Sequence, residues 1–139
     1  MARFFTLNVN GLRDPNKRLS FLHWLAQQSA DFVCLQETHV SSASECSSWF
    51  SSYGFLSLAS PGTAHSCGTV LLYRPCYTLC NSFSDAEGRL VVAKFLFNDI
   101  SFHVACLYAP NRNPARDDFF HFVSEHVDPG SPTVICGDF

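Results

Sequence analysis

The sequence predicts an α/β or α+β fold in which helices cover a sheet. Short apolar runs, typical of buried strands, alternate with segments whose apolar residues recur at helical spacing. The middle of the chain holds successive β-rich runs joined by short turns, which indicates antiparallel pairing. The element order is β, α, β, then mostly antiparallel β, then α and β, and it predicts one sheet with helices on one face.

Length and composition fit one domain or part of a larger one. The 139 residues are 47% hydrophobic and 14% aromatic, enough to fill a core, and only 15% are charged. The net charge of −3 is not typical of a dedicated nucleic-acid-binding protein. It does not exclude a nuclease, because a metal site is itself acidic.

The seven cysteines predict free thiols and a reducing location, either nuclear or cytoplasmic. The one close pair, Cys76 and Cys80, has no second pair or histidine couple nearby, which argues against zinc. No segment approaches the roughly 20 apolar residues of a membrane span. Asn8 and Asn10 interrupt the first apolar run too early for a signal peptide. We therefore expect no membrane association, and no oligomer is predicted.

The first third of the chain predicts two strands and two helices. Asp14 followed by Pro15 combines an N-cap with proline at the first helical position. The apolar run at 32–35 has no polar alternation, which indicates a strand covered on both faces. Strands are expected at 4–9 and 32–35, and helices at 16–28 and 43–50.

The remainder is rich in strands. Asn98-Asp99 lies between two long β-rich runs and predicts a tight hairpin turn. Asn113-Pro114 repeats the N-cap and proline signal, so a helix should follow it. The expected strands are 55–58, 68–73, 79–83, 89–97, 100–108 and 133–136, and the expected helix is 116–126.

Polar side chains directly follow four of these strands, where loops can converge on one site. They are Asn8, Asn10, Glu37, Tyr108, Asn111 and Asp138. Each has an ordinary explanation alone: a carboxylate can cap a turn, and an asparagine after proline is usually a turn residue. Together they supply a metal carboxylate, a potential base and neutral donors for a phosphate, a set that suits metal-assisted phosphoester hydrolysis.

Four strings carry a resemblance that spans the whole chain: TLNVNGLR at 6–13, LQETH at 35–39, LYAPN at 107–111 and GDF at 137–139. They resemble, in order, the motifs of the endonuclease/exonuclease/phosphatase superfamily, and look most like the endonuclease domains of LINE-type retrotransposons. The resemblance implies a four-layer DNase I-like α/β sandwich, with two sheets face to face and helices outside. Residues 1–139 would be the amino-terminal part of one such domain, and apolar sheet surface would be exposed.

The resemblance also implies roles for the site residues. Glu37 would bind Mg²⁺, or Mn²⁺ in its place. Asn8, with Asn10 beside it, would belong to the metal and phosphate network. Arg89 is expected to be structural, although it could reach a phosphate.

The catalytic residues implied are Tyr108, Asn111 and Asp138. Tyr108 would donate to or orient the scissile phosphate, and Asn111 would support that loop or contact the phosphate. Asp138 would orient and deprotonate the attacking water.

The chain departs from the superfamily pattern at its end. The third motif normally continues with Asn after Gly-Asp-Phe, and a later Ser-Asp-His string carries a histidine that acts on the phosphate or the leaving group. None of the six histidines here replaces it by motif. We expect the parent reading frame to continue past Phe139, and the 139-residue fragment alone to be inactive.

The function implied for the complete protein is Mg²⁺-dependent hydrolysis of DNA phosphodiesters, by nicking. Two alternatives stay open: a non-catalytic, truncated remnant of a retroelement, or a phosphatase acting on a small phosphoester. A reverse-transcriptase domain in the same polypeptide would favour the retroelement.

Overall fold

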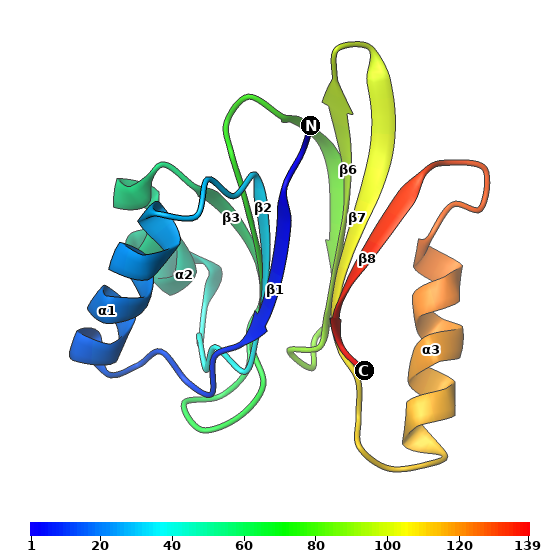
Figure 1. The fold of residues 1–139 in the computed structure, drawn as a ribbon. Helices are drawn as coiled ribbons and strands as arrows, with labels where there is room; N and C mark the ends of the chain where they lie inside the picture. Colours follow the sequence, from blue (N-terminus) through cyan, green and yellow to red (C-terminus); the bar gives the residue numbers. More distant parts are fainter.

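The computed structural model describes residues 1–139 as two four-stranded sheets packed face to face, with helices on the two outer faces (Figure 1). The first half contains β1 (Phe4–Asn8), α1 (Pro15–Ala26), β2 (Phe32–Gln36), α2 (Ala43–Phe50), a 3₁₀ turn η1 (Ser51–Tyr53), β3 (Leu56–Ser60) and β4 (Thr69–Tyr73). The second half contains β5 (Thr78–Ser84), β6 (Leu90–Phe97), β7 (Ile100–Tyr108), α3 (Ala115–His126) and β8 (Thr133–Asp138).

The strand order brings four strand ends together. The sheets have the orders β1-β2-β4-β3 and β5-β6-β7-β8. β1 pairs in parallel with β2, and Asn8 lies opposite Gln36. β7 pairs in parallel with β8, and Tyr108 lies opposite Asp138. Because β1 also contacts β8, the carboxyl ends of both parallel pairs lie at the same end of the sandwich (Figure 1).

The prediction of one sheet with helices on one face is wrong. The β-rich run from β5 to β7 does not extend the first sheet; with β8 it forms a second sheet. Helices α1 and α2 cover the first sheet and α3 covers the second (Figure 1). Element order alone cannot distinguish these arrangements, because an antiparallel run pairs within itself in either case. The DNase I-like sandwich that the resemblance implies is confirmed.

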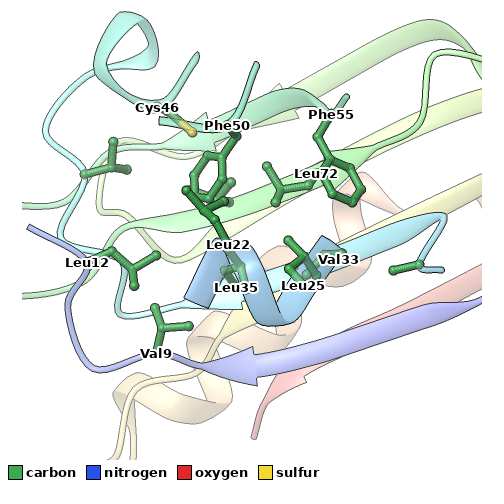
Figure 2. Close-up of a cluster of buried hydrophobic side chains, with 13 residues drawn as sticks. Val9, Leu12, Leu22, Leu25, Val33, Leu35, Cys46, Phe50, Phe55 and Leu72 are labelled. Atoms are coloured by element: carbon green, nitrogen blue, oxygen red, sulfur yellow. The ribbon is translucent and has the colours of Figure 1, made fainter. Parts of the chain in front are cut away.

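The position of β2 between α1 and the second sheet explains why its sequence is continuously apolar. Val33 and Leu35 face α1 and join the core cluster in Figure 2, whereas Phe32 and Cys34 face the second sheet. Phe32 is fully buried, with its ring centroid 4.9 Å from that of Phe4 and 5.1 Å from that of Phe95. Both faces are therefore covered, as the uninterrupted pattern predicts.

The expectation of an exposed apolar sheet face needs correction. Both sheets are present, so their inner faces cover each other and the helices cover the outer ones. Some exposed apolar side chains lie on the outermost strands, such as Leu7 on β1 at 41% and Ile135 on β8 at 48% exposure, and others lie on α1, β6 and β7. The exposed apolar side chains are therefore spread over several elements rather than gathered on one uncovered sheet face.

The helix starts differ in how well the sequence predicts them. The Asp14 carboxylate accepts the backbone N–H of Asn16 at 2.9 Å, so the predicted cap of α1 is confirmed. The predicted cap Asn113 is wrong: Pro114 occupies the cap position of α3 and no side chain caps the helix. Asp117 in the first turn complements the helix dipole instead. The hairpin turn at Asn98-Asp99 is confirmed, since both residues have positive φ.

Two further expectations concern the whole chain. All seven cysteines are free thiols. None of the helices has the length and apolar character needed to cross a membrane.

Helix α2 provides a stability test. Glu45 accepts the Arg13 guanidinium, with Nη2 2.9 Å from Oε1, and the Ser41 N–H at 2.8 Å, which lowers the pKa of the Glu45 carboxyl to about 2. Glu45→Gln should lower the free energy of unfolding by about 1 kcal/mol at pH 7, a typical value for a lost capping interaction. Because folding lowers this pKa from 4.5, the contribution is present above pH 4.5 and disappears as the pH falls towards 2.

Chemical denaturation of the two proteins between pH 7 and pH 2 measures this difference. Glu125→Gln is the control, since the Glu125 side chain is 60% exposed and lies 3.9 Å from the exposed His121. A stability difference for Glu45→Gln that does not change with pH would contradict the assignment.

Candidate active site

One hydrogen bond joins strand ends that are 130 residues apart. The Asn8 Nδ2–H at the end of β1 donates to Asp138 Oδ2 at the end of β8, at 3.0 Å. Asn8 Oδ1 accepts the backbone N–H of Asn10, also at 3.0 Å. The Asn10 N–H thus fixes the amide oxygen of Asn8, and the amide N–H of Asn8 orients the Asp138 carboxylate.

The close approach of β7 and β8 depends on Gly137. A Cβ at this position would collide with the Leu107 carbonyl, so only glycine allows β8 to pair here. The Asp138 carbonyl then accepts the Ala109 N–H at 2.9 Å, which fixes the end of the strand. Beside it is a surface hollow of about 260 Å³, lined by Thr6, Leu7, Asn8, Gln36, Gly137 and Asp138.

Glu37 follows β2 and lies in a loop whose backbone is held on both sides. The Gly11 N–H donates to the Glu37 carbonyl at 2.6 Å, and the next residue, Thr38, donates to the Gly68 carbonyl at 3.0 Å. The Glu37 carboxylate oxygen Oε2 accepts the His39 Nε2–H at 2.8 Å. The carboxylate is therefore positioned by its surroundings rather than free in solvent.

The ionisation of Glu37 follows from these contacts. Partial burial alone would raise the pKa of Glu37. The hydrogen bond with His39 and the nearby Tyr108 hydroxyl and Cys67 backbone N–H outweigh burial and lower this pKa below its ordinary value. Glu37 is therefore a carboxylate at neutral pH.

Tyr108 is the partner of Glu37 from the second sheet. The nearby Glu37 carboxylate, together with burial, raises the pKa of Tyr108 to about 12. The Arg89 guanidinium lies 4.9 Å from the Tyr108 ring centroid and donates to the Tyr108 carbonyl at 3.1 Å. The phenol is thus protonated at neutral pH and acts as a donor.

The structure leaves two of the predicted residues outside these contacts. Asn111 is exposed, and its side chain makes no hydrogen bond. The Asn10 side chain is also exposed; only its backbone takes part, with its N–H bound to Asn8 and its carbonyl accepting Lys17 Nζ at 2.8 Å. The hydrogen bonds therefore form two pairs, Asn8 with Asp138 and Glu37 with His39, and Tyr108 lies beside the second pair.

Two residues at the site were given only ordinary roles by the sequence. Arg89 was expected to be structural, and His39 was only one of the six histidines that do not replace the Ser-Asp-His histidine by motif. Arg89 stacks on Tyr108 because the antiparallel pairing of β6 with β7 brings the two residues side by side. The predicted strands 89–97 and 100–108, joined by a tight turn, could have suggested this contact. His39 reaches back to Glu37 because both residues have positive φ, 60° and 55°, and no sequence pattern indicates that conformation.

The donor set for a metal is small. No group of three His, Cys, Asp or Glu side chains is placed to hold a metal ion. Glu37 supplies one ionised carboxylate, and Asn8 and Asp138 supply further oxygen atoms at the same end of the sandwich.

The sequence and the fold both have known relatives. Residues 5–139 match the Endonuclease/Exonuclease/phosphatase family. The chain is 31% identical over 142 residues to the transposon TX1 uncharacterized 149 kDa protein of Xenopus laevis, covering 96% of this chain and 11% of that protein. It is 25% identical over 149 residues to an exodeoxyribonuclease of Bacillus subtilis, covering 98% of this chain and 57% of that protein.

Among solved structures, the catalytic domain of Xenopus laevis APE2 superposes with a TM-score of 0.74 at 20% identity, covering 97% of this chain and 56% of that one. At this identity the likeness shows the fold alone. The chain thus spans about half the length of the exodeoxyribonuclease and of the APE2 domain, and a ninth of the transposon protein. Since the family match extends over residues 5–139, this chain belongs to the endonuclease/exonuclease/phosphatase family.

Proposed function

We propose that the complete protein hydrolyses DNA phosphodiesters with the help of Mg²⁺ and produces single-strand nicks. The observation that carries the proposal is the Asn8–Asp138 hydrogen bond, which places a carboxylate and an amide from different sheets at one strand-end site. Glu37 and Tyr108 meet at the same end, so a metal carboxylate, a phenol donor and a second carboxylate are available together. Membership of the family supports a hydrolytic reaction at phosphate.

Glu37 fits a magnesium site. Mg²⁺ binds hard oxygen ligands and usually takes only one or two protein carboxylates, with waters and substrate phosphate completing the shell. A single ionised and fixed carboxylate therefore suffices, even without a cluster of three protein ligands. When bound, Mg²⁺ would neutralise the charge that develops on the phosphate.

The chain's own residues would do the rest. Tyr108 donates its hydroxyl proton in a hydrogen bond to a phosphate oxygen. Asp138, oriented by Asn8, accepts a proton from the attacking water. Asn10 and Asn111 are proposed to contact the phosphate from their loops, and substrate would have to bring them into the site.

We also propose that residues 1–139 are the amino-terminal part of one domain within a longer polypeptide. The match covers 56% of the APE2 catalytic domain, which supports the proposal that these residues are part of one domain. The small share of the transposon TX1 protein that is matched supports the proposal of a longer polypeptide, and a reverse-transcriptase domain is the partner that we expect in the same chain.

A plasmid assay tests the function. The complete protein should convert supercoiled DNA to open circles with Mg²⁺ and lose this activity with EDTA. Release of inorganic phosphate from a small phosphomonoester without nicking would favour the phosphatase. Neither activity in folded protein would favour the non-catalytic remnant.

The 139-residue chain alone is expected not to nick plasmid DNA, even with Mg²⁺. The superfamily's Ser-Asp-His histidine is not among these residues, and groups that act as a unit lose most of their effect when one is removed. The assay compares the purified fragment with the complete domain at equal concentration. Mg²⁺-dependent nicking by the soluble fragment would contradict this expectation.

A further inference from the structure

His39 and Glu37 form a half-buried pair that the proposed chemistry does not by itself require. His39 Nε2 lies 2.8 Å from Glu37 Oε2, and the two side chains are only 15% and 17% exposed. An ionised carboxylate oxygen can only accept, so the imidazole is the donor. Both the neutral Nε2–H tautomer and the imidazolium can make this bond.

The backbone of His39 is fixed from several directions. Its N–H donates to the Cys67 carbonyl at 2.9 Å, and its carbonyl accepts Arg13 Nη1–H at 3.2 Å. Glu37 and His39 have φ values of 55° and 60°, a region that residues with a Cβ seldom occupy and that persists only where the surroundings impose it. This strained conformation turns both side chains to the same side of the loop.

Gly11 makes room for the imidazole ring. A Cβ at Gly11 would lie 2.8 Å from His39 Nδ1 and 3.1 Å from His39 Cε1, so any larger residue would displace the ring. The φ of Gly11 is +86°, which also favours glycine. The same residue donates its N–H to the Glu37 carbonyl at 2.6 Å. The loop after β1 therefore fixes the loop after β2 in two ways: by the Gly11–Glu37 backbone hydrogen bond and by the contact of Gly11 with the His39 ring.

We propose that His39 is a positioning residue for Glu37, held in place by Gly11, and that it sets the affinity of the site for its divalent cation. The inference rests on the proposed function, since it takes Glu37 as the metal ligand. Hydrogen bonds from neighbouring groups restrict a ligand's orientation before the metal binds, and their removal commonly weakens metal affinity by about 10- to 100-fold. Without His39, the Glu37 carboxylate would occupy more than one rotamer.

The test is the binding of Mn²⁺ alone, followed by electron paramagnetic resonance of the free ion, to the complete domain and its variants. His39→Leu should weaken Mn²⁺ binding by about tenfold. His39→Gln, which keeps an N–H donor of similar reach, should recover most of the affinity. Gly11→Ala should weaken binding to a similar extent, and the double variant Gly11→Ala/His39→Leu should add little further loss, because both changes remove the same contact. His121→Gln on the exposed face of α3 is the control and should bind Mn²⁺ normally.

Thermal unfolding of each variant separates lost positioning from lost fold, and His39→Gln keeps the test valid if Gly11→Ala does not fold. Wild-type Mn²⁺ affinity in folded His39→Leu, or equal losses in His39→Leu and His39→Gln, would overturn the positioning role while the metal role of Glu37 stands. Unchanged Mn²⁺ affinity in Glu37→Gln would overturn both, because Glu37 would then not be the ligand.

Discussion

Asp138→Asn in the complete domain should reduce the rate of DNA nicking by at least about a hundredfold, the low end of a general-base contribution. Asparagine keeps the size of the side chain and a carbonyl oxygen that can accept the Asn8 Nδ2–H, which lies 3.0 Å from the carboxylate in the wild type. It cannot accept a proton from water. DNA binding should persist and could only gain from the loss of a negative charge near the phosphate.

Two variants separate this role from its rivals, in which Asp138 is a second metal ligand or Tyr108 is the base. Tyr108→Phe removes the phenol, whose pKa of about 12 leaves it protonated at neutral pH, so a fall in rate should reflect a lost donor. If Tyr108→Phe abolishes nicking while Asp138→Asn leaves it nearly intact, our roles are wrong. A shift in the Mg²⁺ requirement of Asp138→Asn would identify a metal ligand instead. Asp117→Asn, an exposed change at the start of α3, is the matched control.

Glu37→Gln should abolish Mg²⁺-dependent nicking and leave the fold nearly unchanged. Glutamine matches the shape of glutamate but lacks the charge that holds the cation. The lowered pKa of Glu37 means that the wild-type carboxylate is fully ionised at neutral pH, so the variant loses a whole charge. Nicking rates measured against Mg²⁺ concentration test this expectation, with thermal unfolding measured in parallel.

The competing explanation for Glu37 is a structural one, in which it only stabilises its loop. In that case nicking would persist with the same Mg²⁺ dependence, and a stability loss of about 1 kcal/mol would appear instead. Glu125→Gln is the matched control, since its side chain is 60% exposed on α3.

Much of the fold could be predicted because local patterns and tertiary structure agree. The apolar run of β2 is covered on both faces, and the Asp14-Pro15 signal starts α1 as expected. The division into two sheets was not predictable from element order, because the pairing of β5 with β6 is local in either topology. The resemblance supplied that information. The cap of α3 failed as a prediction because Asn113 precedes the proline that occupies the cap position itself.

The candidate site was also predictable only in part. Polar residues at strand ends were predictable, since parallel pairing of β1 with β2 and of β7 with β8 places such ends together. The specific partners were not, because the Asn8–Asp138 bond depends on how two sheets pack. The contact of His39 with Glu37 depends on positive φ values in a loop, which the sequence does not encode in any local pattern.

The most direct test of the account is the location of a divalent cation in the complete domain. Crystals grown with Mn²⁺ and a DNA oligonucleotide should give an anomalous difference peak about 2.1 Å from a Glu37 carboxylate oxygen, the distance typical of a Mg²⁺-type ligand. Asp138 and Tyr108 should lie around the same phosphate. A Mn²⁺ ion bound only elsewhere, with no phosphate near Glu37, would contradict the proposal of a single metal-dependent site at these four strand ends.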